Sequence, residues 1–440
     1  MKHYEAYKDS GIRWIGEIPE HWKVTRMKFL GNSIGGVTYS PNDVVESEEE
    51  GILVLRSSNI QKGQLSLKDN VYIKTNIVDK KVLLKGDILI CSRNGSKHLI
   101  GKNICIDERT EGSTFGAFMM IFRSENWRFL SHFFNSPIFK SQSGLFLTST
   151  INQLTSGTLN NFYIALPDSI QEQTQIANYL DQKIIQIDEL IAKKEQLIQL
   201  LEEERIAIIN QAVTKGLNSD VPMKDSGIDW LGEIPEHWES WKISHAFQNI
   251  GSGTTPESGN PIYHENGTIN WLNTGDLNDK MLNSCSKKIT NKAIEDYSSL
   301  KTYPKGSLVI AMYGATIGKT ALLNFETTTN QACCVFGVSD IISVKFLQYW
   351  FKAKKEHIIN LSIGGGQPNI SQQILKDIRL GCPSIEEQVE IVDFLDSKNK
   401  EIEDLNIKIT NEINLLKEYK TTLISDVVTG KIDVREEVLN

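Results

Sequence analysis

Two long segments of this chain place apolar residues at the seven-residue spacing of a coiled-coil helix. Neither glycine nor proline occurs between Gln171 and Thr214, so the first segment predicts one uninterrupted helix. At about 1.5 Å per residue, such a helix is roughly 60 Å long. In the first segment the apolar repeat is interrupted at Lys194 and consists of Leu180, Ile187, Leu201 and Ile208. In the second segment it consists of Leu395, Ile402, Ile409, Leu416 and Leu423.

Both predicted helices have sequence signals at their ends. Pro167 and Pro383 precede polar residues that suit a helix start, and Gly216 and Gly430 follow the last apolar positions. A single helix of this length needs an apolar partner to cover its stripe. An antiparallel pair of the two helices within one chain supplies that partner, and an intermolecular coiled coil is the alternative.

The segments before each long helix have a different pattern, in which short apolar runs alternate with turn residues. This pattern predicts two α+β modules with a mostly β core. Helical patterns at residues 127–140 and 343–359 interleave with the strands. The predicted strands cover residues 52–60, 86–92, 102–106 and 115–122 in the first module, and 269–277, 306–314, 319–325 and 331–338 in the second.

The chain is an internal repeat. Residues 8–22 read KDSGIRWIGEIPEHW and residues 224–238 read KDSGIDWLGEIPEHW, with 13 of 15 positions identical. The predicted strands of the two modules also align, although the residues that follow them differ. The repeat predicts tandem mostly-β domains at residues 1–165 and 223–381, separated by long antiparallel coiled-coil helices at 166–222 and 382–440.

Charge is distributed unevenly over this organisation. The chain of 440 residues has a formal net charge of −8, but the four consecutive segments 1–165, 166–223, 224–381 and 382–440 carry +4, −5, 0 and −7. The neutral to weakly basic modules are therefore the parts suited to bind DNA. No apolar run is long enough to span a membrane. The six cysteines lack metal-ligand spacing, so we expect buried thiols in a reducing cytoplasm, and neither a metal nor a membrane.

Several motifs suggest catalysis without meeting its requirements. The stretch from Gly314 to Thr320 has three residues between its glycines, whereas a nucleotide-binding phosphate loop needs four. The stretch from Asn260 to Tyr263 is similar to the loop with which amino-methyltransferases hold an extruded base, but no glycine-rich loop for a methyl donor accompanies it. The histidines in the GEIPEHW boxes favour a structural turn. We therefore predict no catalytic residues.

The whole layout resembles the DNA-specificity subunit of type I restriction-modification systems. The resemblance rests on the two GEIPEHW boxes, the TTPESGNPIYHENGTINWLNTGDL stretch at 254–277, and the KGDILICSRNG and KGSLVIAMYGATIGKT strands. It also rests on GGGQPNIS at 364–371 and on the LP or CP junctions into the helices. The first module departs from this pattern, since it has only STINQLTSGTLN at 149–160 in place of GGGQPNIS.

The resemblance implies a non-catalytic, cytoplasmic subunit with two target recognition domains. Each domain would read one half of a bipartite double-stranded DNA site, and the paired helices would set the unread gap. The chain would dock two methyltransferase subunits and, in the full complex, two restriction/translocase subunits. S-adenosylmethionine, ATP and Mg would belong to those partners, and this chain would hold no cofactor.

We predict DNA contacts from polar residues at strand ends and on loops. Arginine suits guanine edges, asparagine and glutamine suit adenine, and lysine suits phosphates. The candidates in the first module are Thr38, Tyr39, Arg56, Ser58, Asn59, Arg93, Asn94 and Lys97. Those in the second are Thr254, Thr255, Asn273, Thr274, Tyr313, Thr316, Lys319, Gln367 and Asn369.

Two alternatives remain open. A duplicated coiled-coil adaptor without base readout explains the repeat and the helices equally well, but not why aligned strands carry different loop residues. A degenerate specificity subunit would fold without reading its site.

Overall fold

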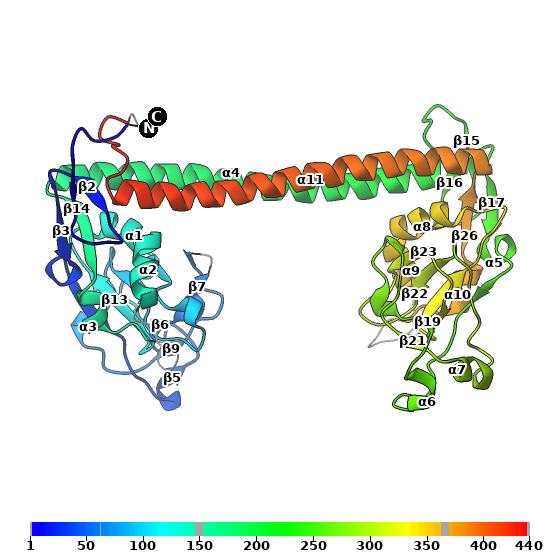
Figure 1. Cartoon of the computed structure of the whole chain (residues 1–440), viewed down its shortest axis with the longest axis horizontal. Coiled ribbons are helices and arrows are strands. Elements are labelled where there is room, and N and C mark those ends of the chain that lie inside the picture. The colour runs from blue at the N-terminus through cyan, green and yellow to red at the C-terminus, as the bar shows by residue number, and fades with distance from the viewer. Residues whose placement is uncertain (1, 62, 146–152, 362–368, 438–440) are drawn as a thin grey trace. The chain divides into compact units, whose positions relative to one another are not determined.

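The computed structural model describes residues 2–61, 63–145, 153–361 and 369–437. The chain forms two compact units (Figure 1). Unit 1 comprises Met1–Lys194 with Asn411–Asn440, and unit 2 comprises Glu195–Thr410. Each unit therefore contains one predicted module together with a portion of both long helices. In the described part of the chain, no helix combines the length and the apolar character needed to cross a membrane.

Unit 1 is built on two small sheets. The first has the order β11-β10-β13-β4 and is antiparallel throughout. Its strands are β4 (Asn32–Gly35), β10 (Ile88–Cys91), β11 (Asn103–Cys105) and β13 (Met119–Arg123). The second has the order β12-β6-β9-β5, with strands β5 (Val44–Val45), β6 (Ile52–Leu55), β9 (Tyr72–Ile73) and β12 (Thr114–Phe115).

Shorter elements complete unit 1. The helices are α1 (Trp127–Asn135), α2 (Pro137–Leu145) and α3 (Ser156–Asn160). The two-stranded pairs are β1 (Tyr7–Asp9) with β2 (Glu17–Pro19), β3 (Trp22–Arg26) with β14 (Tyr163–Pro167), and β7 (Ile60–Gln61) with β8 (Gln64–Leu65). Short 3-10 turns η1 (Met27–Phe29), η2 (Pro41–Asp43), η3 (Ser57–Asn59), η4 (Asp79–Lys81) and η5 (Lys97–Leu99) connect them.

Unit 2 repeats this plan with local changes. Its main sheet has the order β18-β25-β22-β23-β20, and a smaller one has the order β21-β19-β24. These strands are β18 (Ile250–Gly251), β19 (Ile269–Leu272), β20 (Met281–Leu282), β21 (Lys288–Ile289), β22 (Leu308–Ala311), β23 (Thr320–Leu323), β24 (Thr328–Thr329) and β25 (Cys333–Phe336). The pairs are β15 (Met223–Asp225) with β16 (Glu233–Pro235) and β17 (Glu239–Lys242) with β26 (Arg379–Cys382).

The helices of unit 2 surround these sheets. They are α5 (Ile243–Ala246), α6 (Pro261–His264), α7 (Asn291–Asp296), α8 (Val344–Ala353), α9 (Lys355–Asn360) and α10 (Gln372–Asp377), with the turn η6 (Thr274–Asp276). All four residues of β22 and all four of β25 are buried, as a strand covered on both faces requires. This mixed content in tandem units confirms the predicted α+β class.

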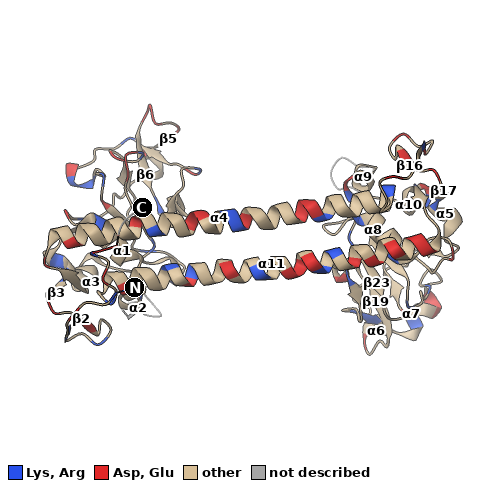
Figure 2. Ribbon diagram, turned by 90° about the horizontal axis from the view of Figure 1, so that it is seen from above, with Lys and Arg blue, Asp and Glu red and all other residues tan. Residues whose placement is uncertain are grey.

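The two long helices, α4 (Ile170–Lys215) and α11 (Ile385–Val428), pair within each unit. In unit 1, Lys420 contacts Asp188 at 2.7 Å and Lys194 contacts Glu412. Residue numbers rise along α4 as they fall along α11, so the two helices are antiparallel. In unit 2, the Asn406 amide donates to Glu202 at 2.9 Å. Figure 2 shows acidic and basic residues interspersed along both helices. The intrachain antiparallel alternative is therefore the one that the chain adopts.

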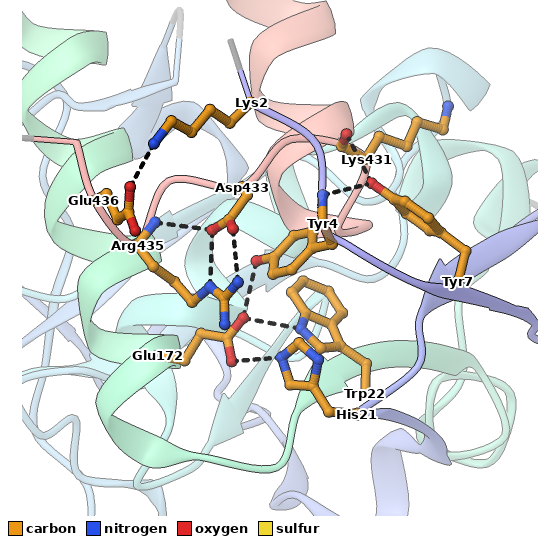
Figure 3. Close-up of polar contacts among 10 residues, drawn as sticks. All are labelled: Lys2, Tyr4, Tyr7, His21, Trp22, Glu172, Lys431, Asp433, Arg435 and Glu436. Atoms are coloured by element: carbon orange, nitrogen blue, oxygen red, sulfur yellow. Dashed lines mark hydrogen bonds and ion pairs between the residues drawn. The ribbon is translucent and has the colours of Figure 1, made fainter.

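The repeated GEIPEHW box connects the module of each unit to a long helix. In unit 1 the fully buried Trp22 donates its indole N–H to Glu172 at 3.0 Å, and His21 contacts the other oxygen of that carboxylate at 2.9 Å (Figure 3). Trp238 and His237 make the same two contacts with Glu387 in unit 2. Glu172 and Glu387 lie in the first turns of α4 and α11. The box is thus the structural turn that the sequence predicted.

In unit 1 the two ends of the chain lie together around Glu172 (Figure 3). Lys2 and Asp433 form an antiparallel bridge, and the Lys431 carbonyl accepts from His3 at 2.8 Å. The Arg435 guanidinium lies 4.8 Å from the centre of the Tyr4 ring, while the Tyr4 hydroxyl donates to Glu172. The contacts join the segment after α11 to the segment before β1.

Candidate nucleic-acid interface

A turn of the same geometry presents one candidate residue in each unit. β6 ends at Leu55 and β19 at Leu272, and both continue into a 3-10 turn, η3 or η6. The backbone N–H of Arg56 donates to Asn59 Oδ1 at 2.9 Å, and that of Asn273 donates to Asp276 Oδ2 at 3.0 Å. The register of β6 with β12 and of β19 with β24 confirms the match. Arg56 and Asn273 therefore occupy equivalent positions.

This turn corrects the expectation for Asn59. The Asn59 side chain is fully buried, and its amide group donates to the Ser66 carbonyl at 3.0 Å while its oxygen accepts from Arg56. Both polar groups are satisfied inside the protein, so no part of the side chain faces a ligand. Asn59 shapes the turn from which Arg56 emerges, and no local sequence pattern indicates that burial.

Four of the candidates in unit 1 line one cavity of about 500 Å³. They are Thr38, Tyr39, Arg56 and Ser58. The Phe118 ring forms another part of the lining, is 60% exposed, and lies 5.5 Å from the Arg93 guanidinium carbon. Sequence reasoning missed Phe118, because an aromatic residue inside an apolar run has the same signature as a core residue. Asn94 adjoins the cavity through a 3.4 Å contact with the Ser57 hydroxyl.

A second cavity in unit 1, of about 480 Å³, has a basic lining. Lys97, Lys102 and Lys140 contribute to it. Of these, Lys102 is the equivalent of Lys319, because the Cys91 N–H donates to the Lys102 carbonyl and the Ala311 N–H to the Lys319 carbonyl, each at 2.8 Å. Lys97 lies in a loop that is longer than its counterpart in unit 2, and its contact with a phosphate stays a prediction. Several ammonium groups around one hollow suit a phosphate.

The candidates of unit 2 form a polar network. The Thr255 hydroxyl donates to Gln331 Oε1 at 2.6 Å, and Gln331 also bonds with the Tyr313 hydroxyl. Burial raises the pKa of the Tyr313 phenol, and the bond with Gln331 opposes part of that rise. Asn273 accepts from the Asn330 amide at 3.2 Å. Gln331 and Asn330 were missed because they lie just before a buried strand, where polar residues more often serve as turn residues.

The remaining candidates of unit 2 have varied surroundings. The Thr254 carbonyl accepts from the Trp271 indole at 3.1 Å, which fixes the backbone there. Thr274 begins η6, while Thr316 and Lys319 lie in the turn between β22 and β23. Gln367 lies outside the described residues.

A further pair of positions is equivalent in the two units. Arg93 forms an isolated antiparallel bridge with Gln153, and Tyr313 forms one with Asn369. The next residues match as well, since Leu154 N–H donates to Ser92 and Ile370 N–H to Met312, each at 2.8 Å. The first module thus contains a counterpart of the GGGQPNIS contact in Gln153. The sequence did not single out Gln153, because the two segments differ in nearly every residue.

The rejected catalytic motifs have structural roles. Gly314 to Thr320 connects the antiparallel strands β22 and β23, whereas a phosphate loop connects a strand to a helix. Asn260 caps α6 by accepting from the Ile262 N–H at 3.2 Å.

Burial raises the pKa of the Cys333 thiol to about 12, which keeps it protonated.

Comparison with known proteins gives the family. The model of the type I restriction modification DNA specificity domain matches residues 19–200 and 235–415. The StySPI type I restriction enzyme specificity subunit of Salmonella potsdam is 24% identical, over 95% of this chain and 90% of its own length. The HsdS subunit of Thermoanaerobacter tengcongensis shares the fold with a TM-score of 0.59, at 15% identity, over 94% of this chain and 98% of that one.

A second solved structure, from work on assembly and conformational transition of the type I R-M system, has a TM-score of 0.72. It is 14% identical and covers 94% of this chain and 99% of that chain. The family model matches twice and spans most of both units. This protein is therefore a member of the type I restriction-modification DNA specificity family, a non-catalytic specificity subunit.

Proposed function

We propose that this protein gives a type I restriction-modification complex its target sequence, with each recognition module reading one half of a bipartite site in double-stranded DNA. The observation that carries the proposal is the set of equivalent positions. Arg56 matches Asn273, Arg93 matches Tyr313, and both members of each pair lie at the end of a strand. One frame that presents different hydrogen-bonding groups is what two readers of different sequences require.

The long helices would set the unread gap and dock the partners. Their apolar stripe is covered by the intrachain pairing, yet other apolar side chains on them remain exposed. Leu190 and Leu415 in unit 1 are 43% and 63% exposed, and Leu200 and Ile407 in unit 2 are 50% and 55% exposed. Exposed apolar residues on a helix rich in charge suit a partner protein. Because Trp22 and Trp238 are buried, the boxes would support this surface rather than contact the partner through their indoles.

In this proposal two methyltransferase subunits and two restriction/translocase subunits assemble on the chain in the cytoplasm. They would bring S-adenosylmethionine, ATP and Mg. The described residues of this chain include no group of three or more His, Cys, Asp or Glu placed to hold a metal ion.

The test is co-expression with the neighbouring methyltransferase subunit, followed by base-resolution methylation sequencing of the host DNA. The proposal predicts one bipartite methylated motif, which gives both half-sites at once. A stable complex that methylates no defined motif would contradict base reading and favour the adaptor or the degenerate subunit.

A further inference from the structure

The cavity of unit 1 contains an arginine that is oriented before any ligand arrives. Arg56 Nη2 donates to Asp69 Oδ2 at 2.9 Å and to the Asp69 carbonyl at 3.0 Å. The Arg56 backbone is fixed separately by the bond to Asn59. A long side chain held at both ends loses little conformational entropy when it binds. The chain thus supplies an oriented guanidinium on the cavity wall.

The same arginine retains unused hydrogen-bonding capacity. Arg56 Nε is buried and has no hydrogen-bond partner among the described residues, and the nearby Ser58 hydroxyl is also buried without one. Both residues line the cavity. An unpaired buried donor is costly unless a ligand satisfies it. A guanidinium has five N–H donors, more than its two bonds to Asp69 use, and the Arg56 side chain lines the cavity, so this wall suits a ligand that presents acceptors.

Asn273, which is equivalent to Arg56 in unit 2, also has hydrogen-bonding groups that the protein leaves unused. The Asn273 amide group donates to the Trp271 carbonyl at 3.0 Å, and its oxygen accepts from Asn330 at 3.2 Å. An asparagine side chain has two N–H donors and two acceptor lone pairs, so one of each is left. One donor beside one acceptor matches the major-groove edge of adenine, whereas two guanidinium donors match that of guanine.

We propose that Arg56 reads a guanine in one half-site, with Asp69 as its positioning residue, and that Asn273 reads an adenine at the corresponding place in the other. This inference rests on the proposed function and adds to it the identity of one base in each half-site. Phe118 and Tyr39, which line the same cavity, supply apolar surface beside the guanine.

The experiment measures binding of the full complex with its methyltransferase subunits to duplexes that carry the methylated motif. Each guanine of one half-site is replaced in turn by 7-deazaguanine, which lacks the N7 acceptor. Binding should weaken roughly 10- to 100-fold at a single guanine, since a bidentate pair discriminates by about that factor. Arg56→Ala should abolish the sensitivity at that guanine alone. 7-Deazaadenine in the other half-site should have the same effect through Asn273.

Methylation sequencing of variants adds an independent readout. Arg56→Gln should relax or change the base at one position of one half-site and leave the gap and the other half-site unchanged. Asp69→Asn keeps the arginine and should weaken the preference at that same position. Arg109→Gln is the matched control, because Arg109 is exposed and pairs with Asp107 outside the cavity, and it should leave the motif intact.

Two results would overturn the inference while the proposed function stands. One is a bipartite motif in which replacement of no guanine N7 weakens binding. The other is a loss of binding on 7-deazaguanine replacement that is equally large for the wild-type protein and for Arg56→Ala. Absence of any bipartite motif for the wild-type complex would instead contradict the proposed function itself.

Discussion

In both units an aspartate on a long helix binds two side chains of the recognition module, but those two side chains differ in type between the units. In unit 1, Asp181 of α4 binds Arg128 at 2.6 Å and His132 at 2.8 Å, both from α1. In unit 2, Asp396 of α11 binds Lys345 and accepts from the Tyr349 hydroxyl at 2.6 Å, both from α8. The positions match while the donors differ. The carboxylate on the long helix is the same in both units. The module supplies a cation and a second hydrogen-bond donor, which are Arg128 and His132 in unit 1 and Lys345 and Tyr349 in unit 2.

The same division holds at the ends of the modules that we propose to face DNA. The turns at Asn59 and Asp276 use one geometry, but the residues that they present, Arg56 and Asn273, have different hydrogen-bonding groups. Constant groups lie where the module meets its own helix, and variable groups lie where a ligand would bind. The predictions below either alter the constant elements or alter one variable element alone.

The largest effect should follow from lengthening the constant helices. Matched insertions of four residues, one between Lys193 and Leu201 and one at the facing part of α11, add about 6 Å of helix at about 1.5 Å per residue. At about 3.4 Å per base pair, the unread gap should grow by roughly two base pairs. Methylation sequencing should show both half-sites unchanged and the original motif unmethylated. An unchanged gap would refute the role of the helices in spacing.

Replacement of the boxed tryptophans should have the next largest effect. Trp22→Ala and Trp238→Ala each remove a fully buried indole and leave a glutamate without its N–H donor. Each should cost about 3–5 kcal/mol in the free energy of unfolding of its own unit. Hydrogen exchange resolved by peptide should show the loss in unit 1 for Trp22→Ala and in unit 2 for Trp238→Ala. A loss spread equally over both units would contradict separate fastening.

Removal of the Asp181 charge should have a smaller, pH-dependent effect. Burial alone would raise the pKa of Asp181, but hydrogen bonds from His132 and Arg128 outweigh it and lower the pKa below its ordinary value of 3.8. A depressed folded-state pKa stabilises unit 1 above the unfolded pKa, and this stability is lost as the pH falls through the folded pKa. Asp181→Asn should therefore cost on the order of 1 kcal/mol at pH 7, after allowance for solvent exposure, and progressively less below pH 3.8.

Tyr349→Phe in unit 2 is the comparison variant for that measurement. Burial and the hydrogen bond to Asp396 raise the pKa of the Tyr349 phenol, so it stays protonated throughout the acidic range. Tyr349→Phe removes a neutral donor and leaves the carboxylate of Asp396 in place, so it isolates what the second donor of the contact contributes. Chemical denaturation at several pH values, read by hydrogen exchange in each unit, separates the two. If Asp181→Asn lowered the free energy of unfolding by the same amount down to pH 2, the charge of Asp181 would not contribute to its contact with Arg128 and His132.

The smallest stability effect should come from a variable residue. Thr255→Val removes a hydrogen bond to the exposed Gln331 and should change the free energy of unfolding by well under about 1 kcal/mol. Its consequence should instead appear in the base preference of one half-site. Thermal unfolding and methylation sequencing of the same variant give both readouts. A changed preference in both half-sites would show that the modules do not read independently.

The constant parts of the molecule were predictable from the sequence, and the variable parts only in outline. The heptad repeat identified α4 and α11 because apolar spacing fixes a helix face, and the duplicated box fixed the domain order. Tertiary packing determined the rest. Asn59 is buried by a turn whose shape no local pattern reveals, and the roles of Phe118 and Gln153 depend on which segments lie beside them.

The most direct test of the account is to exchange residues 30–165 for the equivalent module of another family member and to sequence the methylated DNA of the host. The long helices and both boxes stay unchanged in this chimaera. Independent readers on a constant frame predict a motif with one new half-site, the original second half-site and the original gap. A change in both half-sites, or in the gap, would contradict the central claim.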